Sequence, residues 1–354
     1  MRRRIMGAIS LSDSRFGSYV GNEHGQHGAV IEEIEGLIRV YKDGHVERSP
    51  IVPTVSAAFA TEPDVISRDV TVDDFNGVWA RFYVPKRQTK LPLLVYFHGG
   101  GFCVGSAAWR CYHGFLSKLA SAAECLIMSV NYRLAPEHRL PAAFDDGISA
   151  VKWVHQQAVS SSDEQSWWSA RCNFSKVFVG GDSAGACLAH NVATRLGAPA
   201  GLKPVRVKGV VLIQPFFAGE ARTASERNMV QPASSALSLR ASDAYWRLAL
   251  PPGANRDHPW CNPLSKGAYN LENLSLPPTM VCISELDILK DRNLEFVAAM
   301  KSAGKSVEQV VYTGVRHAFQ ILRNYPLSQV RTHEMIAHIK AFISDGSLNE
   351  CSSF

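Results

Sequence analysis

The sequence predicts an α/β fold with a mostly parallel, doubly wound central sheet. Three observations carry this prediction. Short apolar runs alternate with helical patterns along most of the chain, which is typical of strands joined by crossover helices. Several runs are continuous, as expected of parallel strands buried on both faces. A stretch without strand signals, at about residues 216–270, interrupts the alternation, and we interpret it as an inserted, mostly helical cap.

Length and composition fit this organisation. The chain has 354 residues and is 46% hydrophobic, which suits one large α/β domain with an insertion. We expect residues 29–354 to form this domain, with a cap that combines about 29–64 with about 216–270. Residues 1–28 are rich in Gly, Ser and His, and we expect a disordered tail. Three arginines near the start also weakly resemble an organelle transit peptide.

Charge and cysteine usage exclude several classes of function. The net charge of +5 is mild, and no basic run with interleaved aromatic residues indicates nucleic-acid binding. No stretch approaches the roughly 20 apolar residues of a membrane span. The eight cysteines form no C-x-x-C pair and no zinc spacing, so we expect buried free thiols in a reducing compartment, cytoplasmic or also nuclear. We expect neither a metal nor a cofactor.

The first half of the chain yields these elements. Apolar residues at Ile31, Ile34, Leu37 and Ile38 have helical spacing, which predicts a helix over 31–40. A hairpin over 40–46, with Asp-Gly at its turn, and a strand pair over 65–84 follow. The further expected elements are strands at 93–97 and 125–130, helices at 109–122 and 141–154, and a polar surface loop at 159–172 that carries Trp167 and Trp168.

In the second half, a buried strand from residue 177 runs into a glycine-rich turn and then a helix. Strands at 205–213, 279–284 and 307–312 and helices at 292–303 and 328–342 continue the alternation.

Residues 181–185 (Gly-Asp-Ser-Ala-Gly) lie in the strand–turn–helix context of a G-x-S-x-G nucleophile elbow. Ser183 can be exposed on a strained turn only if its neighbours are nearly free of side chain, and Gly181 and Gly185 provide that room. The helix that begins at Ala184 directs free N–H groups towards developing negative charge. The bare motif is also compatible with a tight turn that merely carries a capping serine.

A histidine base and an acid are expected further along the chain, in the order Ser, acid, His. Asp287 follows the strand after the insertion, and His317 follows the last strand. Both lie at carboxyl ends of strands, where ligands collect in open α/β sheets. Two other acids compete: Asp291 could instead cap the next helix, and Glu285 is expected to point away.

A second glycine-rich segment, His98-Gly99-Gly100-Gly101, follows an early strand. Consecutive glycines let the backbone approach a substrate carbonyl and present N–H groups. The expected oxyanion donors are the N–H groups of Gly100, Gly101 and Ala184. The alternative is a glycine loop that serves only as a flexible turn.

Together, residues 98–102, 132–138 and 181–185 resemble the hormone-sensitive-lipase-like branch of the α/β-hydrolases. Residues 131–146, 255–258, 262–263 and 41–44 resemble the plant carboxylesterases more narrowly, and the similarity covers roughly residues 31–343. The resemblance implies an α/β-hydrolase fold with an eight-stranded sheet and a cap built from an N-terminal helix plus the insertion.

The resemblance also implies hydrolysis of carboxylic esters through Ser183, His317 and Asp287, with an acyl-enzyme intermediate. Within the 132–138 block, Arg133 and Glu137 are expected to tie the loop under the oxyanion segment. Cys187 departs from the asparagine that plant relatives often carry after the elbow, and we expect it to pack.

Two relatives of this family keep other functions open. The gibberellin receptor lacks the catalytic histidine, whereas this chain keeps His317, which argues against a pure receptor. The hydroxyisoflavanone dehydratases share the triad pattern or replace the serine with threonine, and they eliminate water. We expect a small, largely apolar ester substrate and a monomer or weak homodimer. Candidate pocket residues are Phe102, Phe216, Tyr245 and Trp246, with Phe217 beside them, although aromatic residues in a cap more often serve packing.

Overall fold

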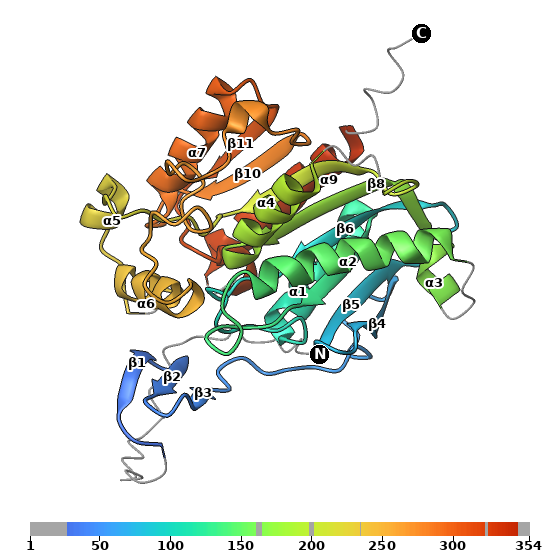
Figure 1. The fold of residues 1–354 in the computed structure, drawn as a ribbon. Coiled ribbons are helices and arrows are strands. Elements are labelled where there is room, and N and C mark those ends of the chain that lie inside the picture. Colours follow the sequence, from blue (N-terminus) through green and yellow to red (C-terminus); the bar gives the residue numbers. More distant parts are fainter. Residues whose placement is uncertain (1–26, 161–164, 198–201, 234, 323–324, 346–354) are drawn as a thin grey trace.

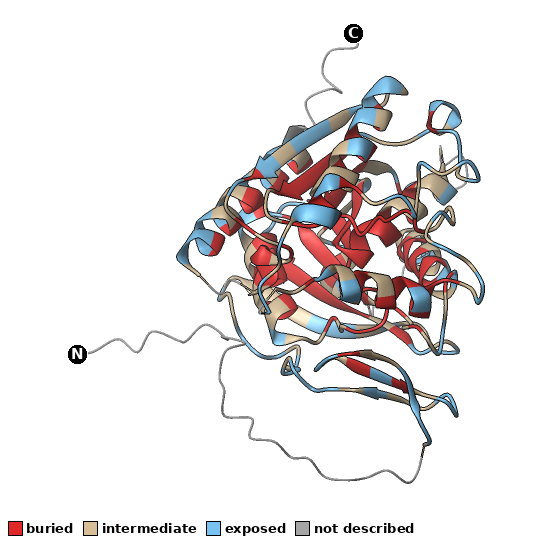
Figure 2. Ribbon diagram, turned by 90° about the vertical axis from the view of Figure 1, so that its left-hand side faces the viewer, coloured by how far each residue is buried: buried red, intermediate tan, exposed pale blue. Residues whose placement is uncertain are grey.

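A computed structural model describes residues 27–160, 165–197, 202–233, 235–322 and 325–345. The tail predicted at residues 1–28 lies outside these ranges, apart from its last two residues. A central sheet carries helices on both faces, and a second, small sheet lies at one end of the molecule (Figure 1). Buried residues concentrate on the central strands and on the sides of the helices that face them (Figure 2).

The central sheet has eight strands in the order β11-β10-β9-β8-β6-β7-β5-β4. All neighbours pair in parallel except at the β4 edge, where β5 is antiparallel to both β7 and β4. This arrangement confirms the mostly parallel, doubly wound sheet. The strands are β4 (Val65–Asp73), β5 (Val78–Pro85), β6 (Leu91–Phe97), β7 (Leu126–Asn131), β8 (Cys172–Asp182), β9 (Val207–Ile213), β10 (Thr279–Ser284) and β11 (Val307–Tyr312).

Two apolar cores, one on each face, explain the continuous hydrophobic runs. In β6, Leu93, Val95 and Phe97 join one core, while Leu94 and Tyr96 join the other. The first core is covered by α2 (Ala142–Val159), α4 (Ala184–Leu196) and α7 (Lys290–Ser302). The second is covered by α1 (Arg110–Ala123), α8 (Phe319–Leu322) and α9 (Pro326–Asp345). A parallel strand buried on both faces needs apolar residues at every position.

The helix predicted over residues 31–40 is wrong. The segment forms β1 (Val30–Ile34) and β2 (Ile38–Tyr41), an antiparallel pair, and β3 (Val46–Arg48) adds to β2. Gly36, at φ +69°, makes the turn that a helix would not contain. Ile38 and Val40 are buried with an exposed residue between them, so a period of two is the correct interpretation. The hairpin predicted over 40–46 is confirmed.

The insertion is much less helical than predicted. It contains only α5 (Ala224–Asn228) and α6 (Leu239–Ala249) in its described residues, and the rest is irregular apart from short turns. Prolines between and after these helices each lack the N–H group that a helix interior needs. Arg247 of α6 forms an ion pair with Glu32 of β1 at 2.7 Å, so the small N-terminal sheet lies against the insertion. The extent of the cap stays a prediction.

The predicted surface loop at 159–172 also needs correction. It contains α3 (Ser166–Ser169), and Trp168 is fully buried. The Trp168 ring packs on Phe82 of β5 and stacks on Trp153 of α2, with ring centroids 4.5 and 5.8 Å apart. Polar neighbours in the sequence hid this contact, because Trp168 is buried while the residues on either side of it are only partly buried or exposed.

Two further features concern the helices and the cysteines. None of the described helices is long and apolar enough to cross a lipid bilayer. Six cysteines lie buried as free thiols, namely Cys103, Cys125, Cys172, Cys187, Cys261 and Cys282.

Candidate active site

Ser183 sits between the end of β8 and the start of α4, on a turn with φ +53° and ψ −120°. Non-glycine residues rarely adopt this conformation. The residues on either side must be glycine, because a side chain there would clash with the backbone. A Cβ atom on Gly185 would lie 1.9 Å from the carbonyl oxygen of Phe97, and one on Gly181 would lie 2.4 Å from the same atom. The turn therefore packs directly against the end of β6.

The structure brings His317 and Asp287 to this turn. His317 Nε2 lies 2.9 Å from Ser183 Oγ, and His317 Nδ1 lies 2.6 Å from Asp287 Oδ2. The side chains are nearly closed off from solvent, since Ser183 and His317 are each 6% exposed and Asp287 is 1% exposed. With the imidazole proton on Nδ1, the serine hydroxyl donates to Nε2. These three residues thus form one buried hydrogen-bonded chain.

The two competing acids, Asp291 and Glu285, form hydrogen bonds with other residues and not with His317. Asp291 lies in the first turn of α7 and accepts a hydrogen bond from Ser225 N at 2.6 Å, so it does not act as the helix cap. Glu285 accepts from Gly314 N at 2.8 Å. Of the three acids considered, only Asp287 contacts the imidazole.

Burial and charge act on His317 in opposite directions. Burial lowers the pKa of the imidazole and is the largest single effect, but the Asp287 charge, its hydrogen bond and a smaller contribution from the Asp182 charge together raise the pKa by more. The net result is a pKa above the usual histidine value.

Gln214, which the sequence interpretation missed, holds the His317 loop. Its Oε1 accepts from Ala318 N at 2.7 Å, and its Nε2 donates to Ser284 Oγ at 2.6 Å. Both Gln214 and Ala318 have positive φ, at +49° and +59°. The only feature of the sequence that could have indicated this role is that Gln214 is a polar residue directly after the apolar run of β9.

The glycine loop after β6 is a tight turn. Gly100 and Gly101 adopt φ of +112° and +59°, and the Gly100 carbonyl accepts hydrogen bonds from the N–H groups of Cys103 and Val104. Among the residues that the structure describes, none accepts a hydrogen bond from the N–H of Gly100 or Gly101. These N–H groups are thus left for another acceptor, as is that of Ala184 at the start of α4.

Asp182 joins the serine turn to the glycine loop, and this too was missed. Its carboxylate accepts hydrogen bonds from Tyr96 at 2.8 Å, Tyr112 at 2.9 Å and Gly99 N at 3.1 Å. The Gly99 N–H also lies 2.7 Å from the Tyr112 hydroxyl. Burial raises the Asp182 pKa to about 6, although the tyrosine hydrogen bonds oppose the rise.

His98 has a structural position in this loop. Its ring stacks on Tyr132 with centroids 4.4 Å apart, and the Tyr132 hydroxyl donates to the His98 carbonyl at 2.7 Å. Burial lowers the His98 pKa to about 4, so the ring is neutral at pH 7.

The block at 132–138 anchors its surroundings in two ways. Arg133 pairs with Asp146 of α2 at 2.6 Å, rather than with the oxyanion segment. Glu137 pairs with Arg48 at 2.6 Å, and Arg48 in turn donates to the carbonyl of Cys103 at 2.7 Å. Glu137 therefore supports the glycine loop through the N-terminal sheet.

The aromatic candidates gather beside the glycine loop. Phe216 and Trp246 stack with centroids 4.8 Å apart, and Phe102 lies 5.7 Å from Trp246. Tyr245 lies so close to Gly101 that a Cβ atom there would be 2.2 Å from the Tyr245 ring. All four side chains are buried and pack on one another.

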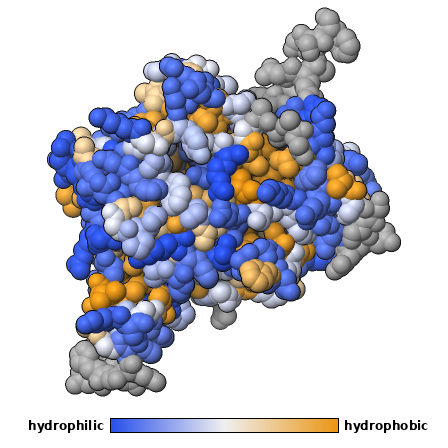
Figure 3. Space-filling model, viewed as in Figure 1, coloured by the Kyte–Doolittle hydropathy of each residue, from blue (hydrophilic) through white to orange (hydrophobic). Residues whose placement is uncertain are grey.

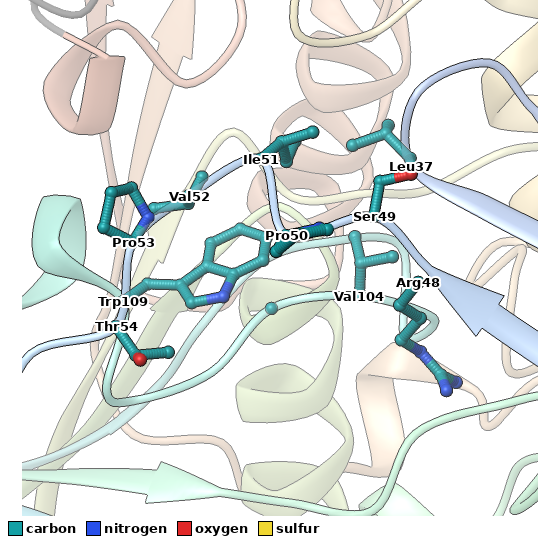
Figure 4. A pocket seen from close by; sticks show the side chains of 11 residues that line it. Leu37, Arg48, Ser49, Pro50, Ile51, Val52, Pro53, Thr54, Val104 and Trp109 are labelled. Atoms are coloured by element: carbon teal, nitrogen blue, oxygen red, sulfur yellow. The ribbon is translucent and has the colours of Figure 1, made fainter. Parts of the chain in front are cut away.

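A cavity of about 390 Å³ is lined by Val104 and Gly105, which follow the glycine loop in the chain, and by Leu37, Trp109 and the segment 48–54. Figure 4 shows the Trp109 ring between Pro50 and Pro53. Ser183, Asp287 and His317 do not line it.

The strand order and the turn that carries Ser183 define one class of protein, the α/β-hydrolases. The family model described as alpha/beta hydrolase fold matches residues 94–321, and the chain belongs to this family. It is 46% identical to probable carboxylesterase 6 of Arabidopsis thaliana over 91% of this chain and 94% of the relative. It is 36% identical to 2-hydroxyisoflavanone dehydratase of Glycyrrhiza echinata over 89% and 96% of the two chains.

Among solved structures, EstE1, a thermostable carboxylesterase cloned from a metagenomic library, matches with a TM-score of 0.68 and 30% identity. The match covers 81% of this chain and 91% of that one. These similarities make the chain a carboxylesterase-like α/β-hydrolase.

Proposed function

We propose that this protein is a serine carboxylesterase that hydrolyses esters of small, largely apolar molecules. The observation that carries the proposal is the buried chain of hydrogen bonds from Ser183 through His317 to Asp287. A serine hydroxyl is a weak nucleophile unless an adjacent base takes its proton, and a base needs a third group to orient it. All three roles have a residue in hydrogen-bonding position here.

In the proposed acylation, His317 Nε2 takes the Ser183 proton as Oγ attacks the ester carbonyl, and Asp287 stabilises the imidazolium. The carbonyl oxygen becomes negative and is bound by the N–H groups of Gly100, Gly101 and Ala184. His317 then gives the proton to the departing alcohol, which leaves an acyl group on Ser183. Water, deprotonated by His317, releases the acid by the same route.

The surroundings support an apolar substrate. Phe102, Phe216, Tyr245 and Trp246 lie beside the glycine loop and would contact the apolar parts of the ester. The Tyr245 ring lies against Gly101, and we expect it to limit the space next to the reacting carbonyl, which favours short to medium acyl chains. No metal or cofactor is part of the proposed reaction.

We also propose that the protein acts as a monomer or weak homodimer in the cytoplasm, or also in the nucleus. The face of the molecule in Figure 3 is mostly hydrophilic, with hydrophobic side chains in separate groups. Large contiguous apolar patches are what stable association usually requires.

Replacing the nucleophile tests the proposal. Ser183→Ala should lower the turnover of nitrophenyl esters by about 10⁶-fold, as loss of a triad serine does elsewhere. The fold should persist, because the turn needs a small residue rather than a hydroxyl, and circular dichroism checks this. A folded variant that keeps a tenth of the wild-type turnover would contradict the proposal.

A dehydratase is the second candidate, because a 2-hydroxyisoflavanone dehydratase covers nearly the whole chain at 36% identity. Elimination of water needs a base but no acyl-enzyme. Assays of nitrophenyl esters and of a 2-hydroxyisoflavanone, run in parallel on the same protein, separate the two. A much higher kcat/KM for dehydration than for any ester would favour the dehydratase.

A further inference from the structure

Gln214 lies where the segments that carry the three residues proposed for catalysis meet. The carbonyl of Ile213, the residue before it, accepts a hydrogen bond from Ser183 N at 2.8 Å, and Phe216 N donates to the Ser183 carbonyl at 3.0 Å. Gln214 N itself donates to the carbonyl of Cys282 on β10 at 2.8 Å. The backbone around Gln214 is therefore fixed to the serine turn and to the strand that leads to the acid.

The Gln214 side chain makes the remaining connection, to the histidine loop. Its Oε1 accepts from Ala318 N at 2.7 Å, and its Nε2 donates to Ser284 Oγ at 2.6 Å. Ala318 directly follows His317, and Ser284 lies three residues before Asp287. One side chain thus joins the segments of the base and of its orienting acid to the segment that holds the serine.

This position requires a side chain with both an acceptor and a donor. A peptide N–H can only donate, so the amide oxygen of Gln214 must face Ala318 and the amide NH2 group must face Ser284. Because Gln214 is 1% exposed and Ser284 is fully buried, water does not compete with these partners for the amide. An apolar side chain at this position would leave the N–H of Ala318 without the acceptor that holds it, which costs free energy.

Both residues joined by the bond between Gln214 and Ala318 have an unusual backbone. The angle φ is +49° at Gln214 and +59° at Ala318, although neither residue is glycine. Such conformations persist only where the surroundings hold them. Without the hydrogen bond, Ala318 can relax towards a more common φ, and this rotation would move His317, the residue before it, relative to Ser183.

We propose that Gln214 is the positioning residue that keeps the imidazole of His317 in line with Ser183. It is buried, acts through Ala318 and Ser284, and does not touch the substrate. The inference rests on the proposed ester hydrolysis and names the residue on which the alignment for its proton transfers depends.

Two esters with the same acyl group test this role, because their alcohols differ in the need for a proton. In acylation the bond between the acyl carbon and the alcohol oxygen breaks, and His317 gives that oxygen the proton taken from Ser183. Ethoxide leaves only with the proton, whereas 4-nitrophenolate is a weak base and leaves without it. A misplaced imidazole should therefore cost more on ethyl butanoate than on 4-nitrophenyl butanoate.

Gln214→Met removes both hydrogen bonds of the side chain and nearly keeps its length. It should lower kcat/KM about 10-fold on 4-nitrophenyl butanoate and about 100-fold on ethyl butanoate, the scale expected for a small displacement of a catalytic group. Partial unfolding would lower both values by the same factor, because it only reduces the amount of active protein. The ratio of the two kcat/KM values thus separates positioning from stability.

Asn293→Leu is the matched control. Asn293 of α7 is also a buried amide, 1% exposed, and its Nδ2 donates to the Pro215 carbonyl at 2.8 Å, in the same segment as Gln214. Within the described part of the chain its side chain forms no hydrogen bond with residues 314–318, so the ratio should stay at the wild-type value. Ser284→Ala removes one partner of Gln214 and should shift the ratio about 3-fold in the same direction as Gln214→Met.

Circular dichroism shows whether each variant folds, and Ser284→Ala decides the test if Gln214→Met does not. Wild-type protein that hydrolyses neither ester would refute the proposed function and this inference with it. If the wild type hydrolyses both, equal losses on the two esters in folded Gln214→Met, or in Ser284→Ala where the first variant does not fold, would overturn the role of Gln214 alone. A shift of the ratio in Asn293→Leu as large as in Gln214→Met would do the same.

Discussion

His317 is the residue whose charge controls the proposed chemistry. It can accept the Ser183 proton only when it is neutral, so the pKa of its imidazole sets the lower pH limit of activity. Burial acts against the Asp287 carboxylate on this pKa, and the carboxylate, with a smaller contribution from Asp182, raises it above the usual value.

The pH dependence of kcat/KM should therefore rise through one group with a pKa above 6.5, the usual value for histidine. Below that pKa the imidazolium has no free nitrogen for the serine proton, so activity is lost as pH falls. Asp287→Asn removes the raising charge and should move the inflection to lower pH, besides slowing the reaction. Asp291→Asn is the control, because Asp291 contacts Ser225 instead. A flat profile from pH 5 to 8 would contradict this role.

A second effect at the residue scale concerns two tyrosines that share one carboxylate. Tyr112 contacts both Asp182 and Gly99 N, whereas Tyr96 contacts Asp182 without reaching Gly99. Tyr112→Phe removes both contacts. Loss of the hydrogen bond to Gly99 N, of about 1 kcal/mol, should disturb the glycine loop and lower kcat about 5-fold with little change in KM.

Tyr96→Phe removes the same kind of hydroxyl and should lower kcat less than Tyr112→Phe. Steady-state kinetics of both variants on one nitrophenyl ester provide the comparison. Equal losses in the two variants, or losses confined to KM, would show that the bond to Gly99 does not position the loop.

At the scale of elements, the central sheet and its crossover helices could be predicted because continuous apolar runs leave few alternatives. The conformation of residues 31–40 could not be predicted, because Ile31, Ile34 and Ile38 fit a helical period as well as they fit two short strands joined at Gly36. The insertion was predicted as an interruption but not as largely irregular backbone. Its conformation depends on contacts such as Arg247 with Glu32, which lie 215 residues apart in sequence.

The contact between α6 and the glycine loop gives a prediction at this scale. In Gly101→Ala, the new Cβ atom would lie 2.2 Å from the buried Tyr245 ring, at a φ of +59°. Gly304→Ala has a similar φ of +69° but meets nothing within 4 Å, so it isolates the backbone strain of about 1 kcal/mol. Gly101→Ala should lower the free energy of unfolding by about 1–3 kcal/mol more than Gly304→Ala does, which is the usual cost of overpacking. Urea unfolding measures both, and equal losses would contradict the close contact.

For the whole molecule, the residues proposed for catalysis were predictable because strand ends of a parallel sheet converge. Ser183, Asp287 and His317 each follow a strand, and the structure places them within hydrogen-bonding distance. The residues that support them were not predictable. Asp182 and Gln214 act through partners in loops far away in the sequence, and no local pattern in the sequence marks such long-range hydrogen bonds.

The central claim is that His317 activates Ser183, and reaction with a fluorophosphonate probe tests it most directly. The probe reacts only with an activated hydroxyl. We predict that one equivalent labels Ser183, located by mass spectrometry of the peptide, and that His317→Val abolishes labelling while the protein stays folded. If folded wild-type protein resists the probe, or if His317→Val is labelled as fast as wild type, Ser183 is not an activated nucleophile. The protein would then act as a binding protein that holds a small molecule without turning it over.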